Sequence, residues 1–268
     1  MNRTRITRSP GARRPVLLGA AVVLMAVTSA SVAAAGDGPG PFGVTVQAAV
    51  NGRTARVGAL FHGSAASGGT GGHFCTASVV HSAGRDLVVT AAHCLDGGGE
   101  ISFAPGYRGG SAPYGFWDVQ GVFLPEGWTD GKDGKDGQGS KVEDSDVAFA
   151  VLGTRDGKEV EDAVGGGNAF AAHQATGATA VTVTGYPSSL DTAVTCTDKP
   201  TAYSRTQQRI ECPAFAGGTS GSPWVNGDGA VVGVIGGHEQ GGDTDDISYS
   251  AVFGSEAANL YREAGRAG

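Results

Sequence analysis

Apolar residues occur along this chain in short runs that glycine-rich turns separate. Glycine accounts for 47 of the 268 residues. Many short β-prone runs between such turns are typical of an all-β barrel or sandwich. The predicted strands cover residues 44–50, 77–80, 87–91, 147–152, 180–184, 224–225, 230–235 and 248–253.

One helix is predicted near the C-terminus, at residues 255–264. Ser255 is a candidate N-cap, and Glu256 suits the positive end of the helix dipole. Leu260 and Tyr261 are expected to face the body of the protein.

The N-terminal 35 residues have the pattern of a secretory signal peptide. Residues 1–14 contain five arginines and no acid, residues 16–27 are mostly apolar, and small residues end at Ala35. The apolar run is short for a membrane-spanning helix, which needs about 20 residues. An uncleaved anchor is the alternative, and Arg13-Arg14 leaves the Sec and twin-arginine routes both open. We expect a secreted protein.

The chain without residues 1–35 is acidic. It keeps 14 basic and 26 acidic side chains, a net charge of −12. Such a charge argues against nucleic acid or an anionic membrane as a partner. A glycine-rich boundary within residues 153–175 separates two predicted halves, 36–160 and 161–268.

Two polar segments, residues 130–141 and 243–246, are predicted to be surface loops. Calcium binding is the alternative for both. In the first, Asp130, Asp133 and Asp136 recur every three residues rather than at the alternating positions of an EF-hand loop.

Four cysteines remain in the exported chain, which indicates two disulfides in one of three possible pairings. The local pairing, Cys75 with Cys94 and Cys196 with Cys212, closes loops of about 20 residues, each worth about 3 kcal/mol in the loop-entropy model. Zinc is the alternative, but no C-x-x-C or H-E-x-x-H spacing is present.

His93 is the candidate general base. It follows the apolar run Leu87-Val88-Val89-Thr90-Ala91-Ala92 and precedes Cys94, so a disulfide at that cysteine would hold its backbone in place. A general base must stay within hydrogen-bond reach of the group that it deprotonates. This context distinguishes it from the other histidines, His62, His73, His81, His173 and His238.

Asp146 is the candidate orienting acid, because it abuts the apolar run 147–152 and can be buried where that strand begins. A buried carboxylate that accepts an imidazole N–H fixes the tautomer and stabilises the imidazolium. Asp144 is the competitor.

Ser220 lies in the segment Gly217-Gly218-Thr219-Ser220-Gly221-Ser222-Pro223, where small residues allow a tight turn. A serine hydroxyl in such a turn is a candidate nucleophile once a base and an acid accompany it.

The order His93, Asp146, Ser220 resembles that of chymotrypsin-like serine proteases. Residues 73–80 (HFCTASVV) resemble the family's H-F-C-G-G-S-L-I strand, and residues 90–94 repeat its T-A-A-H-C motif. Residues 146–152 resemble D-I-A-L-L-x-L, and residues 218–223 resemble G-D-S-G-G-P with two changes. The resemblance spans about residues 42–255.

This resemblance implies two packed six-stranded antiparallel β-barrels with a short C-terminal helix. The barrel in residues 36–160 would carry His93 and Asp146, and the barrel in residues 161–268 would carry Ser220. The Cys75–Cys94 pair matches a disulfide of the family.

Thr219 departs from the family pattern, since digestive members have an aspartate there that pairs with a new N-terminal amine. No I-V-G-G start occurs near residue 40 either. Together with residues 184–187 (TGYP), the segment around Ser220 is similar to V8-like bacterial glutamyl endopeptidases.

The implied activity is hydrolysis of polypeptides through an acyl-enzyme on Ser220, by a monomer without metal or organic cofactor. The backbone N–H groups of Gly218 and Ser220 would form the oxyanion hole. The substrate pocket is assigned to Ala214, Ile235, Gly236, Gly237 and His238. Alanine at 214 does not support a trypsin-type basic preference, and His238 is a candidate ligand for an acidic side chain.

Two other classes of protein are weighed. An α/β-hydrolase needs G-x-S-x-G, whose last position here is Ser222, and it places histidine last in the chain. A catalytically silent protease-like binding module would share the same sequence features.

Overall fold

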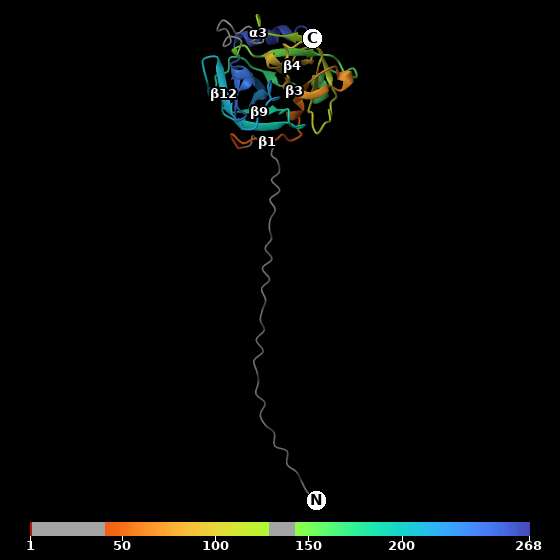
Figure 1. Ribbon diagram of the computed structural model, residues 1–268, viewed down its shortest axis with the longest axis vertical. Coiled ribbons are helices and arrows are strands. Elements are labelled where there is room, and N and C mark those ends of the chain that lie inside the picture. The colour runs from red at the N-terminus through yellow and green to blue at the C-terminus, as the bar shows by residue number, and fades with distance from the viewer. Residues whose placement is uncertain (2–40, 129–142) are drawn as a thin grey trace. The chain divides into compact units, whose positions relative to one another are not determined.

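The computed structural model describes Met1, residues 41–128 and residues 143–268 (Figure 1). The predicted signal peptide after Met1 and the whole polar loop 130–141 therefore lie outside the described residues. Residues 37–268 form one compact unit. Among the described helices, none is long and apolar enough to cross a membrane.

The first half of this unit is a closed antiparallel barrel with the strand order β2-β3-β4-β7-β6-β5. Its interior is filled by fully buried apolar side chains such as Leu60, Phe103 and Trp117. Gly58 permits close packing there, since a Cβ at this position would lie 2.5 Å from the carbonyl oxygen of Ala104. The strands are β2 (Val57–His62), β3 (Thr70–Val79), β4 (Leu87–Thr90), β5 (Ile101–Pro105), β6 (Trp117–Phe123) and β7 (Ala148–Leu152).

The second half consists of two sheets. One has the order β1-β10-β9-β13-β14-β8, with only β8 parallel to its neighbour, and the other has the order β11-β12-β15. Val234 in β14 donates its amide hydrogen to Ser250 Oγ in β15 at 3.1 Å, which joins the two sheets. The strands are β1 (Val46–Gln47), β8 (Ala169–Phe170), β9 (Val181–Gly185), β10 (Val194–Asp198), β11 (Thr201–Ala202), β12 (Gln207–Glu211), β13 (Pro223–Asn226), β14 (Ala230–Val234) and β15 (Ile247–Ala251).

All eight predicted strand segments overlap an observed strand, and the all-β prediction is confirmed. Several strands were missed, among them β10 and β12, because their residues are largely polar. Gln207 and Gln208 in β12, like Thr197 in β10, are buried with hydrogen-bonding partners inside the fold. Strands of this kind lack the apolar alternation by which a strand is recognised in sequence.

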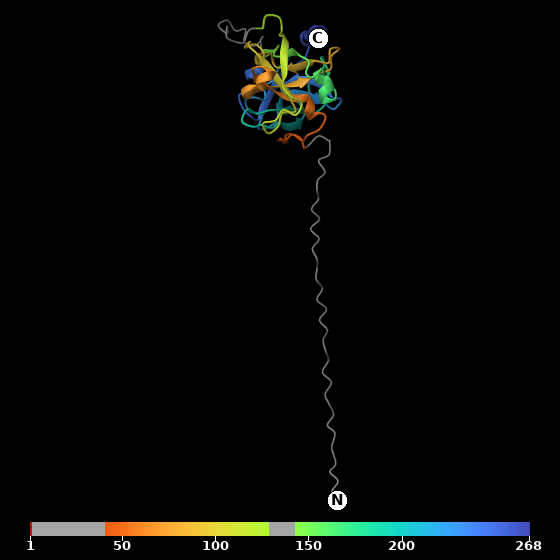
Figure 2. The ribbon, with the colours of Figure 1, turned by 90° about the vertical axis from the view of Figure 1, so that its right-hand side faces the viewer.

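Helices are few. The α-helices α2 (Val160–Val164) and α3 (Ser255–Ala264) are accompanied by the 3-10 helices η1 (Thr54–Arg56), η2 (Ala65–Ser67), η3 (Ala92–Cys94) and η4 (His238–Gly241). In Figures 1 and 2, α3 lies at one end of the unit, where it contacts β6 and β7.

The predicted helix near the C-terminus is confirmed with the same bounds, but its cap is corrected. Gly254 occupies the N-cap position and no side chain caps the helix, while Ser255 is its first helical residue. Leu260 is buried, and Tyr261 stacks on Phe170 with ring centroids 4.7 Å apart. The apolar side of the helix therefore faces the barrel, as predicted.

Both disulfides follow the local pairing. Cys75 in β3 is bonded to Cys94 at the end of η3, and Cys196 in β10 is bonded to Cys212. The first bond joins two neighbouring segments of the first half, and the second closes a loop within the second half.

Candidate active site

His93 lies in η3, which follows strand β4 of the first barrel. Its neighbour Cys94 is bonded to Cys75 in β3. The backbone at His93 is therefore fixed by strand β4 on its N-terminal side and by the disulfide on its C-terminal side. The His93 side chain is 11% exposed. The ring is therefore mostly shielded from solvent and still accessible at one edge.

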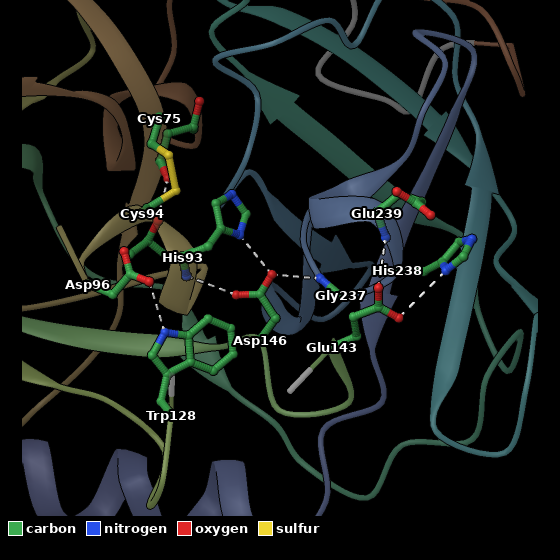
Figure 3. A network of polar contacts seen from close by, with 12 residues as sticks. Cys75, His93, Cys94, Asp96, Trp128, Glu143, Asp146, Gly237, His238 and Glu239 are labelled. Carbon is green, nitrogen blue, oxygen red and sulfur yellow. Dashed lines mark hydrogen bonds and ion pairs between the residues drawn. A yellow bond between two sulfur atoms is a disulfide. The ribbon is translucent and has the colours of Figure 1, made fainter. Parts of the chain in front are cut away.

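Asp146 is 2% exposed and precedes β7, the strand paired with β4. Its carboxylate accepts three hydrogen bonds, drawn in Figure 3: from His93 Nδ1 at 2.8 Å, from the His93 amide at 3.1 Å and from the Gly237 amide at 2.7 Å. An ionised carboxylate only accepts hydrogen bonds, so the imidazole carries its proton on Nδ1. His93 Nε2 is then free to act as a base.

Asp144, the competing acid, is engaged elsewhere. Its Oδ1 accepts a hydrogen bond from Gln207 Nε2 at 3.1 Å. Of the two candidate acids, Asp146 is the one that the fold brings to His93.

Ser220 lies in a turn between β12 and β13, and this turn packs against the first barrel. Its carbonyl oxygen accepts a hydrogen bond from the Thr76 amide in β3 at 2.8 Å. Gly221 has φ +81°, and a Cβ there would collide with Thr90 Oγ1, just before the segment that carries His93. In the part of the chain that the structure describes, no hydrogen bond joins Ser220 Oγ to His93. Catalytic hydrogen bonds are often long before substrate binds.

Gly218 has the backbone conformation that a glycine adopts easily, with φ +95°. A Cβ at this position would lie 2.6 Å from Ser188 N and 2.7 Å from the Tyr186 carbonyl oxygen. Its own carbonyl accepts a hydrogen bond from Thr76 Oγ1 at 3.1 Å. Within residues 41–128 and 143–268, the amides of Gly218 and Ser220 donate no hydrogen bond, so both are available to an external acceptor.

Thr219 is buried, and its hydroxyl donates to the carbonyl oxygen of Ala216 at 2.7 Å. Ser222 Oγ in turn donates to the Thr219 carbonyl at 2.6 Å. The turn around Ser220 is therefore stabilised by its own short side chains, and Thr219 supplies no carboxylate for pairing with an amine.

The residues assigned to the substrate pocket lie in different surroundings. Ala214 is exposed with φ +66°, whereas Ile235 is buried in the core of the second half beside Trp224. Gly236 lies against the carboxylate of Asp146, since a Cβ there would be 2.7 Å from its Oδ2.

His238 points away from His93 and lies beside Glu143 (Figure 3). Its Nδ1 is 3.6 Å from Glu143 Oε2, and its Nε2 is 3.3 Å from the hydroxyl of Tyr203. The ring also packs on Tyr203 and Tyr249, with both centroid distances 4.8 Å. His238 thus belongs to a polar and aromatic cluster with Glu143, Tyr203 and Tyr249.

Thr76, Glu143 and Gln207 contact the site but were not singled out in the sequence. Thr76 lies within the motif of residues 73–80 but stands where the family pattern has glycine, and Glu143 and Gln207 occur in no recognisable motif. Their hydrogen bonds join residues far apart in the chain: Thr76 and Gly218 are separated by 142 positions, and Glu143 and Gln207 by 64.

The side chains of Cys75, His93 and Cys94 offer potential metal-ligand atoms within 4.8 Å of one another. The two sulfur atoms are joined in a disulfide, however, and only a thiolate binds a metal well. This cluster therefore does not fit a zinc ion.

A sequence model of the trypsin-like peptidase domain matches residues 75–234 of this chain. The matched segment includes His93, Asp146 and Ser220. None of the curated proteins compared with the chain matches it.

Solved structures of proteases have the same fold. Protease Anisep from Arthrobacter nicotinovorans is 27% identical with a TM-score of 0.64, and the match covers 80% of this chain and 96% of that one. The thermostable serine protease AL20 from an extremophilic microorganism is 28% identical with a TM-score of 0.66, covering 81% and 100%. A Glu endopeptidase solved in complex with MPD is 17% identical with a TM-score of 0.64, and the match covers 85% of this chain and 99% of that one. At this identity the similarity is one of fold alone. The family model spans more than half of the chain, and the chain therefore belongs to the trypsin-like serine peptidase family.

Proposed function

We propose that this protein is a secreted serine endopeptidase in which Ser220 is the nucleophile, His93 the general base and Asp146 the orienting acid. The observation that carries the proposal is the buried Asp146 carboxylate, which bonds His93 Nδ1 at 2.8 Å beside the turn that contains Ser220. Family membership supports the peptidase activity.

In the first half-reaction, Ser220 Oγ attacks the carbonyl carbon of the scissile peptide bond, and its proton passes to His93 Nε2. The tetrahedral intermediate collapses, the C–N bond breaks, and the same proton goes to the leaving amine. An ester between Ser220 and the acyl part of the substrate remains. Water then attacks this ester with His93 again as the base, which releases the acid and restores the serine.

The negative charge that develops on the substrate oxygen needs donors held in place beforehand. The Gly218 and Ser220 amides suit this role, because each is free of a partner among the described residues. One such donor is worth about 3–4 kcal/mol of transition-state stabilisation. The positive φ of Gly218 orients its peptide group without the strain that another residue would bear.

The proposal includes removal of residues 1–35 on export and the division into functional halves at 36–160 and 161–268. Disulfides persist in oxidising compartments outside the cytosol. The two disulfides of this chain are consistent with such a location.

The substrates proposed are polypeptides as a class. His238 Nδ1 already lies 3.6 Å from the Glu143 carboxylate. A glutamate side chain of a substrate would meet this carboxylate at the same ring, so the proposal does not extend to a glutamate preference. Cleavage mapping with a peptide library measures the side-chain preference directly.

The test is labelling of the exported protein with a fluorophosphonate, which reacts with an activated serine. We expect labelling of the native protein and none of Ser220→Ala. Asp146→Asn should lower kcat about 10⁴-fold near neutral pH, because the asparagine amide can donate to His93 Nδ1 and so favour the tautomer with its proton on Nε2.

A correctly folded protein that the probe does not label, and that cleaves no peptide in the library, would contradict the proposal. That result would favour a protease-like module that only binds partners.

A further inference from the structure

We propose that Gln207 is a positioning residue that holds Asp146 and the Gly237 amide in the geometry required by His93. The inference rests on the proposed function, because it concerns the same His93–Asp146 pair. Gln207 lies in β12 of the second half, whereas Asp146 precedes β7 of the first barrel.

The carboxamide nitrogen of Gln207 contacts the segment that leads into Asp146. It donates to the carbonyl oxygen of Glu143 at 2.7 Å and to Asp144 Oδ1 at 3.1 Å. Gln207 is 4% exposed, so water does not readily replace these bonds. The amide therefore restrains the backbone at Glu143 and the side chain of Asp144, just before Asp146.

The opposite side of the same carboxamide contacts the segment that carries Gly237. Gln207 Oε1 accepts a hydrogen bond from the His238 amide at 3.4 Å. Gly237 has φ +81°, and a Cβ at this position would collide with Oε1 and lie 3.0 Å from the Glu143 carbonyl. Only a residue without a side chain fits between these groups.

These contacts join the two segments that determine the surroundings of Asp146. Oδ2 of Asp146 accepts from both His93 Nδ1 and the Gly237 amide, at 2.8 Å and 2.7 Å. If the spacing between the segments changed, both bonds to this oxygen could not keep their lengths. A planar amide with all its hydrogens bonded sets that spacing more rigidly than apolar packing does.

The adjacent residue provides a matched control. Gln208 is on the same strand and is also 4% exposed, and its Nε2 donates to the Val232 carbonyl at 3.3 Å. None of its side-chain hydrogen bonds among the described residues reaches the segment of Asp146. Replacing either glutamine by methionine keeps the length of the side chain and removes its hydrogen bonds, so the two variants differ in location and not in chemistry.

The experiment compares Gln207→Met with Gln208→Met in the mature protein. For Gln207→Met we expect kcat to fall about 10- to 100-fold with little change in KM, because small displacements of catalytic groups have effects of this size. The acid limb of the pH profile should also move to lower pH. A less well placed carboxylate stabilises the imidazolium less, so the ring loses its proton sooner as the pH rises. Gln208→Met should keep the wild-type kcat and profile.

A second measurement does not depend on turnover. The proton between His93 Nδ1 and Asp146 gives a low-field resonance in NMR spectra of the free protein. We expect it to be broadened or lost in Gln207→Met and retained in Gln208→Met. This measurement tests the positioning role of Gln207 separately from the proposed function. If the fluorophosphonate does not label the wild type, the proposed function is overturned, but the resonance still shows whether Gln207 positions Asp146.

The inference is overturned if Gln207→Met keeps the wild-type resonance and pH profile, or if both methionine variants lose kcat equally and in proportion to stability. If Gln207→Met does not fold, Gln207→Glu replaces it. This variant keeps the side-chain length and the acceptor for the His238 amide but removes the donor to Glu143, and it should broaden or abolish the resonance. Its pH profile does not serve as a readout, because the added negative charge itself stabilises the imidazolium.

Discussion

Thr76 donates its backbone N–H to the carbonyl oxygen of Ser220 at 2.8 Å. Thr76 follows Cys75, whose disulfide partner Cys94 follows His93. The candidate nucleophile and the candidate base, which lie in different halves of the fold, are therefore connected by one hydrogen bond, one disulfide and two peptide links. This connection explains how a turn of the second half keeps its place beside the first barrel.

Thr76→Val should weaken the turn that contains Gly218. The Thr76 hydroxyl donates to the Gly218 carbonyl at 3.1 Å and accepts from the Tyr186 amide at 3.0 Å. Valine has the same shape but leaves a buried amide without a partner, which costs about 1–3 kcal/mol. Urea unfolding should show this loss, and kcat should fall. Thr182→Val, which removes a hydroxyl pair with Thr197, should leave kcat unchanged.

Gly218→Ala should reduce catalysis far more than Gly217→Ala. Alanine at 218 would collide with the backbone of Ser188 and Tyr186 and would be strained at φ +95°, whereas a Cβ at 217 meets nothing within 4 Å. Displacing an oxyanion donor lowers kcat about 10²- to 10³-fold. Steady-state kinetics on one peptide substrate compares the two. Equal effects would mean that the Gly218 amide does not bind the oxyanion.

Removing the two disulfides should have different consequences. Each closes a loop of similar length, with sequence separations of 19 and 16, and each should cost about 3 kcal/mol of stability. Replacing Cys75 and Cys94 by alanine should also lower kcat, because Cys94 adjoins His93. The variant without Cys196 and Cys212 should retain kcat at temperatures where it is folded. Calorimetry and kinetics on both double variants test the distinction.

Tyr186 should make the protein less stable at high pH. Burial raises the pKa of its hydroxyl above the ordinary value, an effect that outweighs the opposing influence of Arg108. In the unfolded chain a tyrosine ionises near pH 10, while in the folded protein Tyr186 keeps its proton. The unfolded state therefore binds fewer protons above about pH 10, and the free energy of unfolding falls as the pH rises further.

Tyr186→Phe removes this contribution. Between pH 9 and pH 11 the variant should lose less free energy of unfolding than the wild type, even though it lacks the weak 3.4 Å hydrogen bond to the Val57 carbonyl. Tyr203→Phe, at an exposed position, serves as the control. Parallel pH curves for Tyr186→Phe and the wild type would argue against ionisation of Tyr186 as the cause.

The sequence by itself determined the all-β class, the strand that precedes His93, the strand that follows Asp146, and the helix Ser255–Ala264. These features are local, since apolar runs, glycine turns and helical periodicity are visible over a few residues. The strand β12 escaped detection because its buried residues are polar and find their partners only in the folded protein.

Tertiary structure alone decided which groups meet. Asp146 rather than Asp144 bonds to His93. Gln207 joins two segments that lie about 60 and 30 positions away in the chain, and Glu143 lies beside His238. The cysteine pairing was likewise one of three until the strands were placed. A hydrogen bond or a disulfide depends on distances of a few ångströms between residues far apart in the chain. Such distances are properties of the packed barrel and sheets and not of any local pattern.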